Sequence, residues 1–300
     1  MPETVRTAPK TLAAASIAVG CVVFAIKLLS WWVTDSVALF SDALESIVNI
    51  GAALAAFVAV SWSQRPDDDD HPYGHHKAEY LSAVLEGALI VLAALLILRE
   101  AAVGFLEPRP LTAPWLGIAI NLCAGVLNAV WALVLIRYGE RHRSPALKAD
   151  GRHLMADVVT SAGVALGLVL AVVTGWSILD PLLAAMVAVN VLKSGWTLVT
   201  ESVGGLMDAA PPEADLSRIR RAIAEHCDDA IEAHDLRTRH AGRRTFVEFH
   251  LVVPADMTVA RAHVICDRIE AAIRREMGES VISIHVEPPH KAKHENLVKV

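Results

Sequence analysis

The sequence has few cysteines, and none of them forms a metal-binding or redox pair. Its four cysteines, Cys21, Cys123, Cys227 and Cys266, include no CxxC spacing. This excludes a disulfide framework, and we expect four free thiols. The sequence also lacks the His-Glu-x-x-His motif that an intramembrane metallohydrolase would use to activate water. We therefore do not expect an enzyme.

Positive charge is too sparse and dispersed for a nucleic-acid-binding protein. The formal net charge is −6, and we find no basic stripe. Apolar residues make up 54% of the chain, which is rare for a soluble protein of this length. Charged residues are concentrated after residue 207. We predict a transmembrane domain over residues 1–207, a soluble domain over 208–290 and a disordered tail over 291–300.

Six apolar segments are each close to the ~20 residues that a helix needs to span a bilayer. They cover roughly residues 11–33, 37–62, 80–98, 111–136, 154–176 and 178–199. Lys and Arg occur in the second and fourth connections, whereas the first and fifth connections have neither. The positive-inside rule then places both termini in the cytoplasm. We expect a multi-pass protein of the inner (plasma) membrane.

Two of the apolar segments each carry a polar pair one helical turn apart. Glu45 and Asn49 lie in the second segment, and His153 and Asp157 lie in the fifth. The i, i+4 spacing places the side chains of a pair on one helix face. If the helices face each other, three oxygens and one imidazole nitrogen could hold a four-coordinate divalent metal. The fifth helix must then begin near Ala146.

Two alternatives accompany this transport-site hypothesis. Asn and Ser side chains often form hydrogen bonds between membrane helices, so part of this polarity could be structural. The ionisable residues favour a functional site, because a charge inside hydrocarbon is costly. Asp42, one turn before Glu45, fits either the outer mouth of the site or a cap at the helix start.

The loop at residues 67–76 reads DDDDHPYGHH and is a second candidate site. Histidines beside carboxylates in a short loop with Pro and Gly form a metal-ligand pattern. We predict that Asp68, His71 and His75 converge on one ion. We expect Asp67 and Asp69 to be solvated.

After Pro211 and Pro212 the pattern changes to helix, strand, strand, helix, strand. The predicted elements cover residues 213–226, 231–239, 245–254, 258–277 and 279–287. A turn at Ala241-Gly242 would join the first two strands into a hairpin. Two helices on one side of a three-stranded sheet make a small α+β domain.

Four histidines and a glutamate form a third candidate site in this domain. His285 and Glu287 share one face of the last strand. His250 lies on the non-apolar face of its strand, and His234 lies on the hairpin partner. This number of ligand types in a small domain favours a metal site. If His263 lies on the far side of its helix, it would join the others only from a second subunit.

Together these motifs resemble the cation diffusion facilitator family of divalent-metal/proton antiporters. The resemblance covers nearly the whole chain, including the loop Asp-Asp-x-His-x-x-Gly-His-x-Lys-Ala-Glu and the strand Ala-His-Asp-Leu-Arg-Thr-Arg. It is similar to the bacterial zinc and iron exporters. The resemblance implies a homodimer with a metallochaperone-like cytoplasmic domain. It implies Glu45, Asn49, His153 and Asp157 as the transport site, Asp68, His71 and His75 as a loop site, and His234, His250, His285, Glu287 and the partner's His263 as a two-metal site.

Two positions depart from the family pattern. The zinc exporters have two aspartates in the second span, where this chain has Glu45 and Asn49. Asn carries no charge, so a filled transport site has one negative charge fewer. Glu287 stands where Asp is usual. One imidazole with oxygens suits Zn²⁺ first and Fe²⁺, Mn²⁺ or Co²⁺ next.

These observations predict proton-coupled efflux of a divalent metal by alternating access. Ligands must be deprotonated to bind metal, and His titrates near neutral pH, so protons and metal would compete for one site. The alternative is a membrane scaffold or sensor that binds metal without transport and recruits partners through its C-terminal domain.

Overall fold

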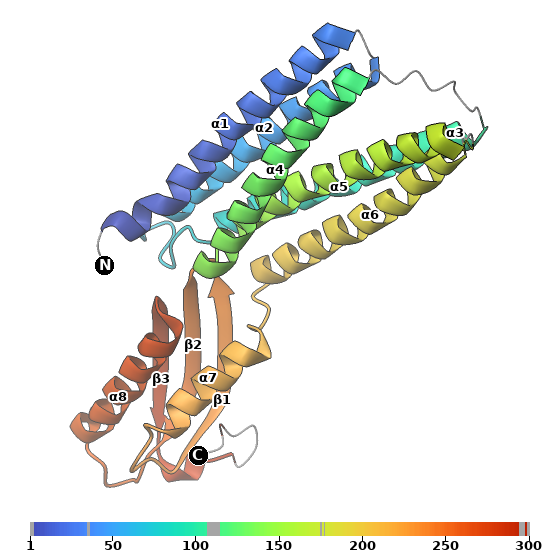
Figure 1. Cartoon of the computed structure of the whole chain (residues 1–300). Helices are drawn as coiled ribbons and strands as arrows, with labels where there is room; N and C mark the ends of the chain where they lie inside the picture. Colours follow the sequence, from blue (N-terminus) through green and yellow to red (C-terminus); the bar gives the residue numbers. More distant parts are fainter. Residues whose placement is uncertain are drawn as a thin grey trace. The chain divides into compact units, whose positions relative to one another are not determined.

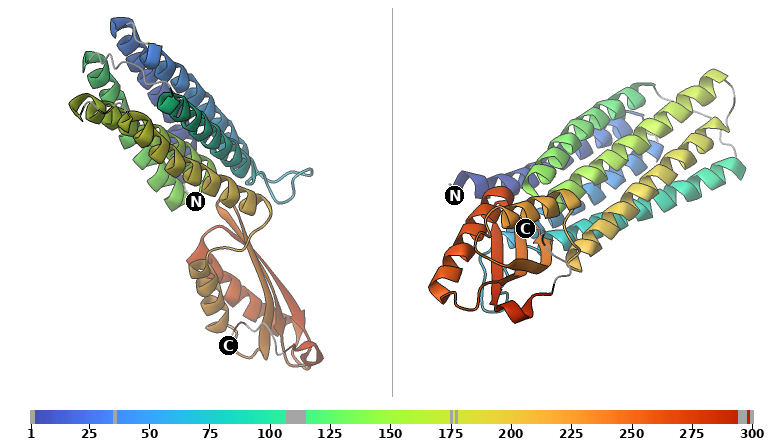
Figure 2. Two further views of the ribbon diagram at one scale, coloured as in Figure 1. Left: turned by 90° about the vertical axis from the view of Figure 1, so that its right-hand side faces the viewer. Right: turned by 90° about the horizontal axis from the view of Figure 1, so that it is seen from below.

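The computed structural model describes residues 3–34, 37–106, 115–174, 176, 178–293 and 298. Inside these ranges some helix side chains, including those of Asp42 and Glu45, lie outside the described set. The chain forms two compact units, Met1–Val203 and Gly204–Val300. The first is helical, and the second contains the sheet (Figures 1 and 2).

The first unit consists of long helices in two groups, α1, α2 and α4 in one and α3, α5 and α6 in the other, inclined to each other (Figure 1). They are α1 Glu3–Thr34, α2 Val37–Ser63, α3 Ala78–Leu106, α4 Trp115–His142, α5 Pro145–Thr174 and α6 Leu179–Leu206. The six predicted helical segments are confirmed, and α5 begins at Pro145, next to the expected Ala146. Within the described ranges, Pro9–Leu29, Ala78–Leu106 and Leu122–His142 combine the length and hydropathy of a membrane span.

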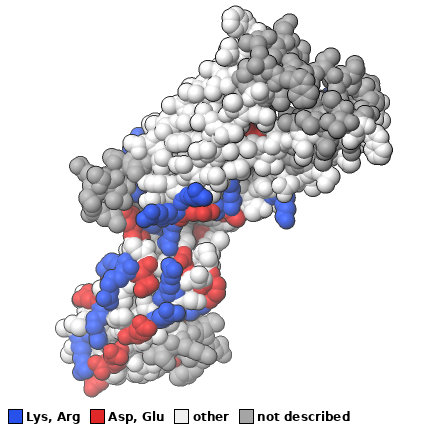
Figure 3. Space-filling model, in the orientation of Figure 1, with Lys and Arg blue, Asp and Glu red and all other residues white. Residues whose placement is uncertain are grey.

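Close approach between these helices depends on small residues. A Cβ atom at Gly151 of α5 would lie 2.8 Å from Ile136 Cγ1 of α4, and one at Gly195 of α6 would lie 2.8 Å from Ile90 Cγ2 of α3. Glycine therefore allows the helix backbones to pack closely. Such packing matters between membrane helices, because the hydrophobic effect does not drive their association. On the face drawn in Figure 3, the described surface of this unit is largely uncharged except at one end.

The second unit is the predicted helix, strand, strand, helix, strand domain. It contains α7 Glu213–Ala224, β1 Glu232–Ala241, β2 Arg244–Val252, α8 Val259–Met277 and β3 Ser280–Glu287. The sheet order is β1-β2-β3, with β1 antiparallel and β3 parallel to β2. Apolar side chains of α7 and α8 pack with Val247, Phe249 and Leu251 into one core. One face of the sheet is therefore covered by helices (Figure 1).

Two local features of the sheet differ from the sequence prediction. The hairpin turn is Gly242-Arg243 rather than Ala241-Gly242, with Gly242 at φ 54°, which a Cβ atom would disfavour. The register of β1 also shifts between His234 and Arg237, where Asp235 has φ 52°. This is a β-bulge, a feature that alternation of apolar residues does not reveal. All four cysteines are free, as predicted.

Thr258 caps α8, and its removal is expected to loosen this helix. Its hydroxyl accepts a hydrogen bond from the Arg261 backbone N–H at 3.3 Å. We expect Thr258→Ala to lower the free energy of opening α8 by about 1 kcal/mol. Hydrogen exchange of the α8 amides in the full-length protein should therefore be about fivefold faster. Ser217→Ala, an exposed hydroxyl in the middle of α7, is the matched control, and equal acceleration by both variants would contradict the capping role.

Candidate metal sites

The polar pairs of α2 and α5 meet inside the helical unit. Asn49, His153 and Asp157 are 4%, 3% and 7% exposed. The Asn49 side-chain amide donates to Asp157 Oδ2, and Asn49 Oδ1 lies 2.9 Å from His153 Nε2. Thus the structure brings together three of the four side chains predicted for the transport site. Glu45 lies one turn earlier on α2, and its side chain is outside the described residues.

With Asp157 ionised, these contacts determine which atoms donate and which accept. A carboxylate only accepts hydrogen bonds, so Asn49 Nδ2 must face Asp157 and Asn49 Oδ1 must face His153. His153 Nε2 is then the donor and carries a hydrogen. Because a metal binds the unprotonated nitrogen, a metal ion at Nε2 would displace this proton.

The loop between α2 and α3 brings together the three residues predicted there. Asp68 Oδ1 lies 3.1 Å from His71 Nδ1, and Asp68 Oδ2 lies 3.4 Å from His75 Nε2. The two imidazole centroids are 4.3 Å apart. The three side chains each offer a ligand atom within 4.8 Å of the others. One carboxylate between two imidazoles fits a single divalent cation.

Local backbone geometry holds this cluster. Gly74 has φ 81°, and a Cβ atom there would lie 2.6 Å from Asp67 Oδ1. Partial burial raises the pKa of Asp68, but hydrogen bonds from the backbone N–H and ring of His71, with both imidazole charges, bring that pKa below its ordinary value. Asp68 therefore remains an anionic ligand as the pH falls, until the pH reaches this lowered pKa.

Asp68→Asn is expected to weaken metal binding at the loop by at least about tenfold, because it removes the charge that both imidazoles face. The measurement is a Zn²⁺ titration of full-length protein in which Asp157→Asn and Glu287→Gln disable the other candidate sites. Asp69→Asn, an exposed neighbour, is the matched control. Equal affinities for the two loop variants would show that Asp68 is not a ligand.

The sheet register gathers three predicted residues of the C-terminal domain into a row. His234 pairs with His250 across β1 and β2, and His250 pairs with His285 across β2 and β3. Their ring centroids are 5.3 and 5.0 Å apart. Because paired residues in neighbouring strands point to one face, the three imidazoles line the sheet face opposite the helices.

Glu287 reaches all three imidazoles of this row. Its Oε1 lies 3.2 Å from His250 Nδ1 and 3.7 Å from His285 Nε2, and its Oε2 lies 3.5 Å from His234 Nε2. The His234 nitrogens, His250 Nδ1 and Glu287 Oε2 are buried without a hydrogen bond of good geometry within the described chain. Such unsatisfied ligand atoms fit a metal site, and one carboxylate with two oxygens could bridge two ions.

Two acidic residues beside this row were not predicted. Glu232 Oε1 lies 2.8 Å from His234 Nδ1 and also accepts the Lys293 backbone N–H. Asp235, at the β-bulge, lies within ligand distance of His234 and His250. A hydrogen bond from the Lys293 ammonium group is the main cause that lowers the pKa of Asp235. The bulge turns Asp235 toward the row, so no strand pattern could have identified it.

His263 is the predicted residue that this chain does not add to the row. It lies on α8, is 73% exposed on its side chain, and its Nε2 is 3.7 Å from Asp267 of the same helix. Since α8 packs on the opposite face of the sheet, its contribution from a second subunit stays a prediction.

The helical unit also buries carboxyl groups outside the predicted sites. Glu79 accepts hydrogen bonds from Ser63 and Ser144, which ties the start of α3 to α2 and to the α4–α5 turn. Glu86 of α3 and Asp150 of α5 are both buried. The sequence signal for Asp150 was its spacing, because it lies three residues before His153 and seven before Asp157.

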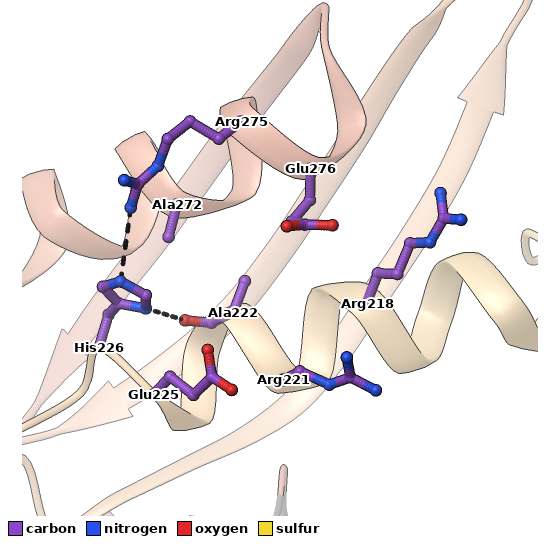
Figure 4. A pocket seen from close by; sticks show the side chains of 8 residues that line it. All are labelled: Arg218, Arg221, Ala222, Glu225, His226, Ala272, Arg275 and Glu276. Carbon is purple, nitrogen blue, oxygen red and sulfur yellow. Dashed lines mark hydrogen bonds between the residues drawn. The ribbon is translucent and has the colours of Figure 1, made fainter.

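A groove of about 370 Å³ lies between α7 and α8 (Figure 4). Basic and acidic side chains mix along it, among them Arg218, Arg221, Glu225 and Glu276. His226 Nδ1 donates to the Ala222 carbonyl, so its Nε2 accepts from an Arg275 N–H at 3.5 Å. Because both ring nitrogens of His226 are used, this imidazole is not a ready metal ligand.

Both units of the chain match models of known protein families. The family model described as the cation efflux transmembrane domain matches residues 13–207, and that described as the cytoplasmic domain of cation efflux proteins matches residues 211–289. The chain belongs to the cation diffusion facilitator family. The first unit is therefore a helical transmembrane domain, the second is the small cytoplasmic domain, and the protein is a metal cation efflux transporter.

Two curated relatives align over most of this chain. The uncharacterized transporter sll1263 of Synechocystis is 45% identical over 273 residues, which are 91% of this chain and 88% of the relative. The cation-efflux pump FieF of Escherichia coli O127:H6 is 31% identical over 276 residues, which are 92% and 91%. A solved structure of CzrB in its zinc form is 43% identical, covers 29% of this chain and 98% of that chain, and has a TM-score of 0.27.

Proposed function

We propose that this transporter exports a divalent transition metal from the cytoplasm in exchange for protons, by alternating access in a homodimer. Zn²⁺ is the first candidate cargo, followed by Fe²⁺, Mn²⁺ and Co²⁺. The observation that carries the proposal is the buried contact of Asn49 with both His153 and Asp157. Ionisable groups inside a membrane domain are costly, so their presence supports a functional role.

The chemistry of the contact supports proton coupling. His153 Nε2 carries a hydrogen when Asn49 accepts from it, and metal at this nitrogen would release the proton. Opening to the outer, more acidic side would return protons to His153 and to one carboxylate, and the cargo would leave. Glu45 completes the proposed ligand set from the preceding turn of α2.

The loop and C-terminal clusters would bind metal from the cytoplasm in this proposal. We place both termini on the cytoplasmic side of the inner membrane. Metal bridged by Glu287 between His234, His250 and His285, with His263 from the partner subunit, would draw two C-terminal domains together. That contact would bias the transmembrane domains, which is a coupling between sites.

The test is metal-dependent proton movement in proteoliposomes of the full-length protein, with Zn²⁺, Fe²⁺ and Mn²⁺ in parallel. We expect one metal to be transported in exchange for protons moving in the opposite direction, and the other metals to be transported more slowly. Protein-free liposomes are the control for leakage. Absence of flux with every metal, together with intact metal binding by the C-terminal domain, would contradict transport and support the scaffold alternative.

A further inference from the structure

Polar side chains form two facing files on α3 and α5. Glu79, Ser82 and Glu86 follow one face of α3, and Asp150, His153 and Asp157 follow one face of α5. Each file has the i, i+3, i+7 spacing of a single helix face. Ala83 of α3 and Ala149 of α5 belong to one buried cluster, so these helices pack directly against each other.

Two carboxyl groups of these files are buried and incompletely hydrogen-bonded. Glu86 is 0% exposed and Asp150 is 1% exposed. Ser82 donates to Glu86 Oε1 at 3.1 Å, and Ser16 of α1 donates to Asp150 Oδ2 at 2.5 Å. Their other oxygens, Glu86 Oε2 and Asp150 Oδ1, have no hydrogen-bond partner among the described residues. Ala83, one turn before Glu86, and Ala149, next to Asp150, belong to one buried cluster, so both carboxyl groups lie where α3 packs on α5.

The charged groups of the surrounding helices do not neutralise this pair. On α5, Lys148 and Arg152 pair with Glu201 of α6. Lys193 of α6 is exposed. Lys27 of α1 lies eleven residues beyond Ser16, which is roughly 16 Å along the helix axis. Within the described ranges, no ion pair includes Glu86 or Asp150.

The remaining charged and polar groups nearby are neutral or already bonded. On α2, the amide of Asn49 is bonded to Asp157 and His153 of α5. Trp131 of α4 donates to Ser16, which in turn donates to Asp150. His153 lies one turn beyond Asp150 on α5. The neutral hydroxyls of Ser82 and Ser16 are therefore the described donors to the carboxyl pair.

Two ionised carboxylates without a cation would each carry a desolvation cost of several kcal/mol in this position. One proton removes one of these charges and with it most of the desolvation cost of that group. We propose that Glu86 binds a proton at neutral pH, because a second buried negative charge beside Asp150 would have no cation to balance it among the described residues. This proton site lies on α3, apart from the metal ligands. A role of this site in transport rests on the proposed proton-coupled efflux. The protonation of Glu86 itself does not depend on that proposal.

Infrared spectroscopy of the full-length protein in liposomes tests the bound proton directly. A protonated carboxylic acid has a C=O stretch that is resolved from carboxylate bands. Near neutral pH we expect an acid band in the wild type that is lost in Glu86→Gln. The control is Glu225→Gln, which should retain the band because Glu225 is an exposed carboxylate of the C-terminal domain. Other buried acids contribute equally to both spectra and cancel in the difference. Identical wild-type and Glu86→Gln spectra would overturn the proposal.

A second variant keeps the test decisive if Glu86→Gln does not assemble. Asp150→Asn removes the negative charge near Glu86, so we expect the Glu86 acid band to disappear at a lower pH than in the wild type. The same pH dependence of this band in Asp150→Asn and in the wild type would overturn the role of Asp150.

Flux measurements separate this proposal from the proposed function. In Glu86→Gln we expect metal still to cross the membrane. The factor by which a pH gradient accelerates this flux should be at least about tenfold smaller than in the wild type. Absence of flux in the wild type would refute proton-coupled efflux and leave the infrared result to decide the proton site. Undiminished dependence in Glu86→Gln would remove Glu86 from the transport cycle.

Discussion

Asp157→Asn is expected to lower metal flux in proteoliposomes by at least about 100-fold, equivalent to about 2.7 kcal/mol. Asp157 is 7% exposed and accepts from the Asn49 amide. In the variant, asparagine keeps the shape of the side chain but removes its charge. Two amides would then face each other near His153, and a divalent cation would lose an anionic ligand in a medium that solvates it poorly.

The measurement is the initial rate of cargo uptake at equal protein content, with the metal identified in the wild type. Glu201→Gln is the matched control, because Glu201 is a partly exposed carboxylate of α6 that pairs with Arg152 and Lys148. We expect this control to retain most of the flux, since exposed ion pairs contribute little. A rate for Asp157→Asn close to that of the control would exclude Asp157 as a cargo ligand.

The sequence predicts the architecture well because long helices and short alternating strands leave strong periodic patterns. Apolar runs identified α1 to α6, and alternation of Val247, Phe249 and Leu251 identified β2. The start of α5 was correct for a different reason. His153 can meet Asn49 only if the helix begins well before the apolar run, and Pro145 is the observed first residue.

Details that depend on pairing between strands were less predictable. The turn was misplaced by one residue, because Ala241 continues the ladder with Arg244 and leaves Gly242 with the positive φ. The bulge at Asp235 depends on how β1 meets β2, which the sequence of one strand does not specify.

The candidate sites divide in the same way. Asp68, His71 and His75 are close in sequence, so their spacing was sufficient to predict one cluster. Glu86 was missed because it is a single acidic residue in an apolar stretch, and Asp150 was missed because it lies among the charged residues before the predicted fifth span. Their relation arises from the packing of α3 on α5.

Glu287→Gln is expected to weaken metal binding at the C-terminal row by about 100-fold. Glu287 is the carboxylate that approaches His234, His250 and His285, at 3.5, 3.2 and 3.7 Å. Glutamine has the same length, so the fold should be unaffected. Its side chain is neutral, however, and its NH₂ group would point a donor at a ring nitrogen that should bind metal.

Calorimetric titration of the full-length protein with Zn²⁺ measures this effect, with Asp68→Asn and Asp157→Asn present to silence the other candidate sites. Glu248→Gln is the matched control, because Glu248 is an exposed carboxylate on β2 two residues before His250. If Glu287 bridges two ions in each row, its replacement should lower the affinity of both, and the titration should lose two equivalents per chain. Loss of affinity in the Glu248 variant alone would instead locate the binding site at Glu248. Equal binding by the wild-type row and Glu287→Gln would mean that the three imidazoles hold metal without the carboxylate. The burial of Glu287 Oε2 without a hydrogen bond of good geometry would then need another explanation.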